Sequence, residues 1–228
     1  MEENITAIVL AAGSGNRMHQ KIKKQYLQIK SKPILYYSLR AFEESMVDNI
    51  IVVTGEAEIQ WVRETIIERY GFKKVSQIVA GGQERFQSVY QGLKAAKGST
   101  MVLIHDGARP LVSQEIITNS VEGVRKYGAV IAAVPVIDTI KQVDEQGVII
   151  NTPDRRELMA AQTPQSFEYE LIKSAYDKMM SHSGAILTDD SMVLEYYGHH
   201  KVRIIEGSYR NMKVTIPEDL ALLENYLG

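Results

Sequence analysis

The sequence predicts an α/β fold in which a mostly parallel sheet carries crossover helices and one arm projects from it. Six short apolar runs, rich in valine and isoleucine, each reach a Gly, Asp or Pro near their end: ITAIVLAAG, NIIVVTG, VSQIVAGG, TMVLIHDGARP, AVIAAVPV and KVRIIEG. Continuous rather than alternating apolar runs are typical of strands buried on both faces. Segments with helical spacing separate these runs, and that alternation indicates βαβ units.

Four of the intervening segments place mostly apolar side chains at helical spacing. Their members are Leu35, Leu39 and Phe42; Phe86, Val89, Leu93 and Ala96; Ile116, Ser120 and Val124; and Leu220, Leu223 and Leu227. Before the last helix, Thr215 and Glu218 have the spacing of a capping box, with Pro217 inside the first turn. We therefore expect a helix to begin there.

Residues 137–167 interrupt the alternation. Two β-prone runs flank the turn sequence DEQG, and the outer half of the segment is polar. We interpret it as a projecting β-arm at about residues 137–160, and a surface hairpin without function is the alternative. Because no repeat, low-complexity tract or linker divides the chain, we expect residues 1–228 to form a single domain that includes this arm.

Composition limits the classes of function. The chain has 228 residues with 26 Lys and Arg against 28 Asp and Glu, a balance that argues against a nucleic-acid or membrane-surface role. The absence of cysteine excludes disulfides, thiolate catalysis and Cys-ligated zinc. The opening MEENITAIVLAAG is acidic before a short apolar run, and no window reaches the ~20 apolar residues of a membrane span. We expect a cytoplasmic protein without nucleic-acid or membrane partners.

Small residues follow the first predicted strand. Residues 11–15 read AAGSG, which lets a ligand approach the backbone beyond the carboxyl end of that strand. The segment matches neither a Walker loop nor the dinucleotide fingerprint, which needs a glycine where Met18 stands. Glycines alone are weak evidence, and a strand-to-helix turn without a ligand is the alternative.

A basic cluster follows this loop directly: Arg17, Lys21, Lys23 and Lys24. A guanidinium and several ammonium groups beside exposed backbone N–H groups suit a polyphosphate. A solvated run of charge is the alternative, but the position after the glycines favours a phosphate cradle.

Asp106 ends the apolar run MVLIHD, so its carboxylate should emerge at a strand end beside the opening loop. That is a suitable place for an oxygen-ligated Mg²⁺. A helix N-cap or a partner for Arg109 are the alternatives. We interpret the neighbouring His105 as structural.

Eight motifs, in order along nearly the whole chain, resemble the 2-C-methyl-D-erythritol 4-phosphate cytidylyltransferases: LAAGSGNRM, KKQYL, AGGQERFQSV, HDGARP, DTIK, AAQTPQSF, TDDS and NMKVTIPEDL. The resemblance implies a doubly wound, Rossmann-like fold of the nucleotide-diphospho-sugar transferase kind. It implies Mg²⁺-dependent transfer of a cytidylyl group from CTP to a small polyol phosphate, 2-C-methyl-D-erythritol 4-phosphate, with release of pyrophosphate. It also implies a homodimer in which each arm completes the partner's site.

The resemblance assigns roles by position. The residues implied to bind the nucleotide are Ala11, Ala12, Gly13, Gly15, Gly82 and Ser88. The residues implied to act on the phosphates are Arg17, Lys24 and Lys213. The residues implied to form the sugar-phosphate pocket are Arg109, Thr139, Arg155, Thr163 and Thr188, with Thr139 and Arg155 reaching from the arm into the partner's site. Asp106 would hold Mg²⁺.

Three positions depart from the family pattern: Lys23 replaces a frequent Pro, Gln83 a frequent acidic residue, and Gly107 a frequent Ala. Gln83 leaves open how the side chain at this position takes part in base recognition. The alternatives in function are a D-ribitol-5-phosphate cytidylyltransferase and a non-catalytic nucleotide-binding module. An NAD-dependent oxidoreductase is weaker, because the third glycine and an acidic ribose-binding residue are both absent.

Overall fold

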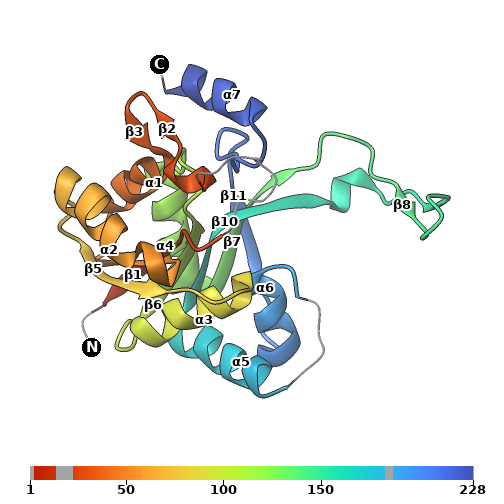
Figure 1. The fold of residues 1–228 in the computed structure, drawn as a ribbon. Helices are drawn as coiled ribbons and strands as arrows, with labels where there is room; N and C mark the ends of the chain where they lie inside the picture. The colour runs from red at the N-terminus through yellow and green to blue at the C-terminus, as the bar shows by residue number, and fades with distance from the viewer. Residues whose placement is uncertain (1–2, 14–22, 183–186, 228) are drawn as a thin grey trace.

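The computed structural model describes residues 3–13, 23–182 and 187–227. Within these residues, the fold centres on a seven-stranded sheet in the order β11-β7-β10-β6-β1-β4-β5 (Figure 1). Neighbouring strands are parallel, except that β10 is antiparallel to both β6 and β7. The strands are β1 (Ile5–Leu10), β4 (Asn49–Thr54), β5 (Val75–Ala80), β6 (Met101–Asp106), β7 (Ala129–Pro135), β10 (Met159–Glu168) and β11 (Arg203–Glu206). Each of the six apolar runs forms one strand, which confirms the mostly parallel α/β fold.

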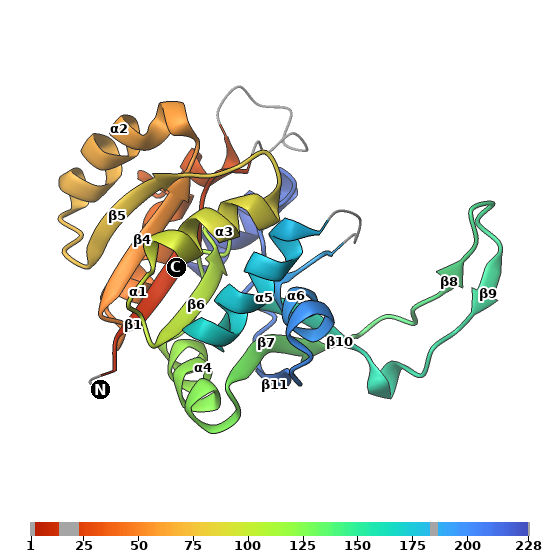
Figure 2. The ribbon, with the colours of Figure 1, turned by 90° about the horizontal axis from the view of Figure 1, so that it is seen from below.

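Helices cover both faces of the sheet (Figures 1 and 2). One core contains residues of α1 (Ile34–Glu43), α2 (Ile59–Val62) with the π-helical η4 (Arg63–Glu68), and α4 (Gln114–Tyr127). The other contains residues of α3 (Arg85–Ala95), α5 (Tyr169–Ser181) and α6 (Asp190–Val193), which η6 (Leu194–Gly198) extends. Because side chains alternate along a strand, Val9 packs into the first core and Ile8 into the second. The fold is therefore doubly wound. None of the described helices is both long and apolar enough to cross a bilayer.

The strand β10 follows the expected arm of about residues 137–160 and belongs to the sheet. Residues 162–167, the last part of the segment that interrupts the alternation, are buried there. Their polarity is compatible with burial because the polar side chains bond internally: Gln162 donates to the Ser208 carbonyl and Gln165 to Asp189. Polar composition alone therefore did not indicate a surface segment here.

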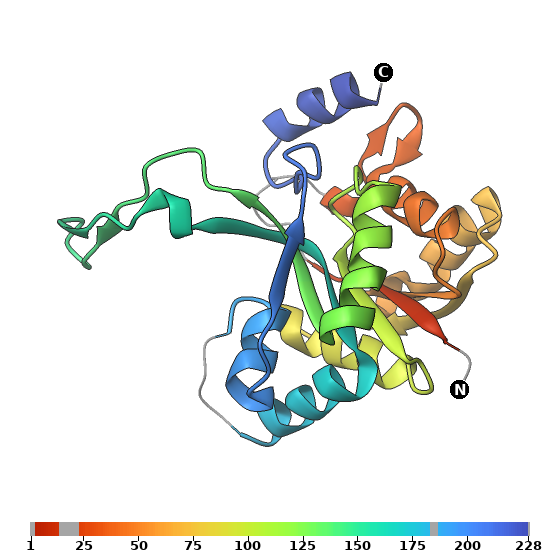
Figure 3. The ribbon, with the colours of Figure 1, turned by 180° about the vertical axis from the view of Figure 1, so that it is seen from behind.

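The arm itself connects β7 to β10 and stands away from the sheet (Figures 1 and 3). Residues 137–152 are all exposed. Its antiparallel hairpin pairs β8 (Gln142–Val143) with β9 (Ile149–Asn151), and η5 (Arg155–Glu157) follows. The turn falls in DEQG, where Gly147 has φ +80°, a conformation that favours glycine.

A third, smaller core ties two distant segments together beside the carboxyl ends of the strands. It contains the buried side chains Ile29, Ile34, Val214 and Leu223. It joins the hairpin of β2 (Gln28–Ile29) and β3 (Lys32–Pro33) to α7 (Glu218–Tyr226). Lys213 directly precedes the buried Val214, so this core also fixes the position of the Lys213 backbone.

The start of α7 confirms a helix but not the predicted cap. The helix begins at Glu218, yet Thr215 donates both its N–H and its hydroxyl to Asp219 Oδ2, at 2.6 and 3.0 Å. The predicted capping box with Glu218 is therefore wrong. Pro217 already has helical backbone angles, φ −57° and ψ −34°. The carboxylate that accepts from Thr215 is therefore that of Asp219, four residues later, and not that of Glu218.

Candidate active site

A cavity of about 440 Å³ opens where β1 and β6 end. Leu10 pairs with Asp106 in the register, so the two parallel strands end at the same level. From β1 the chain adds β4 and β5 on one side, and β6 then returns to the other side, which makes this edge a topological switch point. The lining includes Ala11, Ala12, Gly13, Lys24, Gly82, Gln83, Arg85, Ser88, Asp106 and Lys213.

The backbone that follows β1 is held by Gln25, a residue that the sequence did not identify as part of the site. The buried Gln25 donates its side-chain N–H groups to the carbonyls of Ala11 (2.5 Å) and Gly13 (3.1 Å). The N–H of Ala11 donates to Val53 across 2.6 Å. The backbone of the small-residue loop is thus fixed while one side of it lines the cavity.

The loop after β5 approaches the first loop closely. A Cβ at Gly81 would lie 2.5 Å from that of Ala12 and 2.6 Å from the Ser88 hydroxyl, so only glycine fits. The next N–H, that of Gly82, donates to the Ser88 hydroxyl at 3.1 Å. Ala12, Gly82 and Ser88, predicted separately as nucleotide contacts, therefore form one wall of the cavity.

Lys24 lies in a short 3₁₀ turn, η2 (Lys24–Tyr26), that is anchored to the end of β4. Lys23 pairs with Glu58 at 2.6 Å, and the Tyr26 hydroxyl donates to Glu58 at 3.0 Å. Burial alone would raise the pKa of Glu58, but hydrogen bonds from Lys23 and Tyr26 outweigh it and lower the pKa below its ordinary value. Lys24 lines the cavity from this anchored turn.

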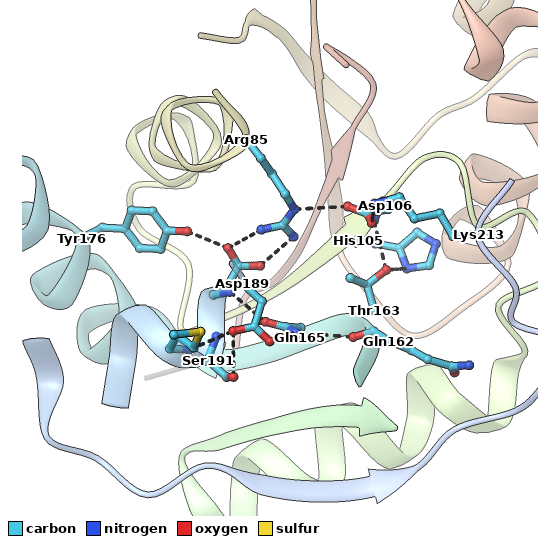
Figure 4. Close-up of polar contacts among 12 residues, drawn as sticks. Arg85, His105, Asp106, Gln162, Thr163, Gln165, Tyr176, Asp189, Ser191 and Lys213 are labelled. Carbon is cyan, nitrogen blue, oxygen red and sulfur yellow. Dashed lines mark hydrogen bonds and ion pairs between the residues drawn. The ribbon is translucent and has the colours of Figure 1, made fainter. Parts of the chain in front are cut away.

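Asp106 lies between two cations. Lys213 Nζ is 2.7 Å from Oδ2, and Arg85 Nε is 3.4 Å from Oδ1 (Figure 4). Burial opposes ionisation of Asp106, but the charges of Arg85 and Lys213 outweigh burial and hold the pKa of this carboxyl well below its usual range. The carboxylate is therefore charged and lines the cavity, and it does not cap a helix.

Behind Asp106, His105 and Thr163 form a buried polar pair. The Nε2–H of His105 donates to the Arg109 carbonyl (3.0 Å), and Nδ1 accepts from the Thr163 hydroxyl (3.1 Å) in the tautomer that fits both contacts. Burial lowers the pKa of His105 to about 4, so the ring is neutral near neutral pH. The Thr163 oxygen also accepts the Asp106 N–H at 3.1 Å. His105 therefore has a structural role, as the sequence predicted. Thr163 holds the backbone of Asp106 through its hydroxyl oxygen.

Arg109 is held by the C-terminal segment. Its Nη1 donates to the Asn211 carbonyl at 2.7 Å. Asn211 is fully buried and donates its amide to the Thr163 carbonyl (2.8 Å) and to Gln162 (3.2 Å). Burial lowers the pKa of Arg109 from its ordinary value. Arg109, Thr163 and Lys213 are therefore connected through one polar network.

Of the described residues predicted for the sugar-phosphate pocket, none lines this cavity within one chain. Thr139 and Arg155 are exposed in the arm, where Arg155 Nη1 donates to the Ile137 carbonyl at 2.6 Å. Thr188 is exposed, and its hydroxyl contacts the Met192 sulfur at 3.1 Å. Gly15 and Arg17 lie outside the described residues. Their roles stay predictions.

Four residues that line or support the site were not predicted individually: Gln25, Arg85, Asp190, which pairs with Arg85 at 2.8 Å, and Asn211. Each lies within one of the eight motifs, namely KKQYL, AGGQERFQSV, TDDS and NMKVTIPEDL. The available signal was a charged or amide side chain inside a motif. The hydrogen-bond partner of Gln25 lies 14 residues away in the sequence, and that of Arg85 lies 105 residues away. The motifs alone therefore did not reveal these contacts.

The cavity suits a magnesium ion only together with ligand phosphates. No group of three or more acidic or histidine side chains that could hold a metal occurs among residues 3–13, 23–182 and 187–227. Mg²⁺ is commonly bound by one or two carboxylates plus substrate phosphates, and the ionised Asp106 can supply such a carboxylate. The donor set therefore fits a nucleotide-borne Mg²⁺.

Comparison with known proteins agrees over nearly the whole chain. Residues 5–228 match the family IspD, 2-C-methyl-D-erythritol 4-phosphate cytidylyltransferase. A protein of that name from Lachnoclostridium phytofermentans is 48% identical over 225 residues, covering 99% of this chain and 97% of the relative. Another, from Clostridium botulinum strain 657, is 49% identical over 224 residues, covering 97% of this chain and 96% of the relative.

Among solved structures, the 4-diphosphocytidyl-2C-methyl-D-erythritol synthase of Anaerococcus prevotii matches with a TM-score of 0.86 at 33% identity, covering 99% of this chain and 96% of that one. The Francisella tularensis 2-C-methyl-D-erythritol 4-phosphate cytidylyltransferase matches with a TM-score of 0.78 at 28% identity, covering 98% and 99%. The family match, the identity to curated relatives and the likeness in fold agree with one another. The chain belongs to the 2-C-methyl-D-erythritol 4-phosphate cytidylyltransferase family.

Proposed function

We propose that this protein transfers the cytidylyl group of CTP to 2-C-methyl-D-erythritol 4-phosphate and releases pyrophosphate. The observation that carries the proposal is the charged Asp106 at the switch-point cavity, flanked by Lys213 at 2.7 Å and facing the backbone of the small-residue loop. Such a cavity offers cations, a carboxylate and close backbone approach, which are the groups that a metal-borne triphosphate requires. Family membership supports methylerythritol phosphate over ribitol 5-phosphate as the acceptor.

The reaction joins two anions, so its main requirements are charge cancellation and alignment. An oxygen of the acceptor phosphate forms a bond to the α-phosphorus, while the bond from that phosphorus to the bridging oxygen breaks and the electron pair leaves with pyrophosphate. A phosphate monoester is already ionised near neutral pH, since its second pKa is about 6, and the step needs no general base. This is consistent with a cavity whose neighbouring histidine, His105, is buried behind Asp106.

In this proposal Lys24 and Lys213 flank the reacting phosphate and Arg17 holds the triphosphate tail. Ala11, Ala12, Gly13 and Gly15 lie against the nucleotide through their backbone, and Gly82 and Ser88 contact the base and ribose. Lys24 and Lys213 both line the cavity, and they come from two separate segments, η2 and the segment before α7. An acceptor bound between two such ammonium groups would lose much of its repulsion toward the α-phosphate.

We propose that Mg²⁺ enters with CTP and that Asp106 is its protein ligand. When bound, the ion would neutralise charge on the phosphates. Lys213 now occupies Asp106 Oδ2, so binding of phosphates requires this ammonium to turn from the carboxylate toward them.

We also propose a homodimer in which each arm covers the partner's cavity. The arm exposes large apolar side chains: Ile137 (63%), Val148 (56%), Ile149 (57%) and Ile150 (59%). A cluster of this kind on a slender hairpin favours burial against another chain. Thr139 and Arg155 would then reach the partner's sugar-phosphate pocket beside Arg109, Thr163 and Thr188. We place the enzyme in the cytoplasm, which a chain without cysteine suits.

The test is pyrophosphate release by the purified protein with Mg²⁺, methylerythritol 4-phosphate and, in turn, CTP, UTP and ATP. Release with CTP well above the other nucleotides is expected. Silence with all three would favour a non-catalytic binding module instead.

A further inference from the structure

Arg85, at the start of α3, lies between two carboxylates. Its Nη1 and Nη2 donate to Asp190 Oδ1 and Oδ2, at 2.9 and 2.8 Å, and only Nε faces Asp106, at the longer distance of 3.4 Å (Figure 4). The two-point pair with Asp190 is the stronger one by geometry, since a guanidinium binds a carboxylate best through two parallel N–H donors. The fork of Arg85 therefore points away from the cavity carboxylate.

Asp190 is held firmly in the place where it binds this fork. Its side chain is fully buried, and the Tyr176 hydroxyl donates to Oδ1 at 2.6 Å. Its backbone N–H donates to Gln165 Oε1 at 2.9 Å, and the N–H of Ser191 shares the same acceptor at 3.0 Å. Gln165 belongs to β10, so the sheet itself fixes Asp190.

Without Asp190, the nearest carboxylate available to Arg85 would be Asp106. A guanidinium that turned to bind Asp106 through both Nη groups would occupy the oxygens that face the cavity, and it would compete there with a phosphate-borne cation. We propose that Asp190 is a positioning residue of this site, which binds both Nη groups of Arg85 and so leaves Asp106 available to the cavity. The inference rests on the proposed function for the role of Asp106.

A purely structural role for the Arg85 and Asp190 pair is the competing explanation. Breaking a buried ion pair lowers stability by itself, so loss of stability does not separate the two explanations. The Mg²⁺ concentration that half-saturates CTP binding does separate them. It depends on whether Asp106 is available, whereas a merely less stable protein binds with an unchanged Mg²⁺ requirement.

The first variant is Asp190→Asn, which keeps the shape and removes the charge. We expect its Mg²⁺ requirement for CTP binding, measured by calorimetry, to rise about tenfold, in the range of coupling between contacting charges. In its crystal structure the Arg85 guanidinium should contact Asp106 through two donors. An unmoved guanidinium or an unchanged Mg²⁺ requirement would overturn the proposal.

Two further variants make the result specific. Asp177→Asn is the matched control, because Asp177 also accepts from a tyrosine, Tyr90 at 2.8 Å, and from a cation, Lys173 at 2.6 Å, but lies on α5 away from the cavity lining. It should leave the Mg²⁺ requirement unchanged. The double variant Arg85→Gln with Asp190→Asn has no guanidinium left to bind Asp106 through two donors and keeps only the wild-type contact from Lys213, so its requirement should return to within about threefold of the wild type.

If Asp190→Asn does not fold, the double variant decides, since it contains no unpaired buried charge. A Mg²⁺ requirement raised tenfold or more in that variant would overturn the proposal. Wild-type protein that binds Mg²⁺ and CTP without forming product would contradict the proposed function and leave the binding comparison valid. Wild-type protein that does not bind CTP would contradict both.

Discussion

Lys213 donates to Asp106 Oδ2 across 2.7 Å, and this contact joins residues 107 positions apart in the chain. It connects the segment before α7 to the end of β6, and the Lys213 ammonium group lines the cavity. In the proposed reaction, an incoming phosphate would compete with Asp106 for this ammonium. The ion pair therefore keeps the Lys213 side chain beside the proposed phosphate site.

Lys213→Ala should lower turnover by about two to three orders of magnitude, comparable to removing one preorganised donor from a charged transition state. Lys24→Ala should lower turnover by a similar factor, since Lys24 also lines the cavity. Steady-state rates at saturating CTP and acceptor measure this effect. Lys201→Ala, an exposed lysine near β11, is the control. A loss below tenfold in a folded Lys213 or Lys24 variant would remove that residue from the catalytic role.

Arg155→Ala should raise KM for the acceptor more than KM for CTP, because Arg155 would act from the arm on the partner's sugar-phosphate pocket. Mixing subunits tests the arrangement directly. At an acceptor concentration below the raised KM, Lys213→Ala and Arg155→Ala chains should each have low activity alone and should regain about a quarter of wild-type activity when co-expressed, because half of the dimers would be mixed and each would hold one intact site. Co-expressed chains that stay inactive would count against composite sites.

Gln25→Met should weaken CTP binding and lower stability by about 1–3 kcal/mol, since it leaves buried carbonyls of Ala11 and Gly13 without their donor. CTP binding can be followed by fluorescence of the single tryptophan, Trp61, whose ring lies 4.7 Å from that of Tyr26 beside the anchored turn. Gln28→Met, at an exposed position on the same segment, should change neither quantity. Equal effects of the two substitutions would contradict the anchoring role.

Glu58 should make stability depend on pH in the acid range. Its pKa is lowered in the folded chain, because hydrogen bonds from Lys23 and Tyr26 outweigh burial, so the unfolded chain takes up this proton at a higher pH than the folded one does. The contribution is complete above the ordinary value of 4.5 and is lost as the pH falls through the folded pKa. Urea denaturation at pH values above and below 4.5 should show a smaller pH effect in Glu58→Gln than in the wild type. Glu56→Gln, exposed in the same short helix η3 (Glu56–Glu58), should retain the wild-type dependence.

The sequence was sufficient for most of the fold because its signals are local. The apolar runs and helical spacings each lie within a few turns of chain, and all six runs form strands. The strand β10 was not predicted as part of the sheet because residues 162–167 are polar, and their burial depends on partners such as Ser208 and Asp189 that only the fold brings near. The capping of α7 by Asp219 depended on the backbone angles of Pro217, which spacing alone does not give.

In the site, the sequence predicted residues at strand ends more readily than it predicted their partners. Asp106 and the small-residue loop follow from the position of β1 and β6, since parallel strands end at one edge. Arg85 and Asp190 could not be paired from the sequence, because their contact joins α3 to α6 and depends on Gln165 of β10, which accepts the backbone N–H of Asp190. Whether the arm completes a second site depends on a partner chain and stays a proposal.

The most direct test of the central claim offers both acceptors at once. The protein is incubated with Mg²⁺, CTP and equal amounts of methylerythritol 4-phosphate and ribitol 5-phosphate, and the products are separated and identified by mass. The account predicts that 4-diphosphocytidyl-2-C-methyl-D-erythritol is the main product and that it forms together with an equal amount of pyrophosphate. A cytidylylated ribitol as the main product, or no cytidylylated product at all, would contradict it.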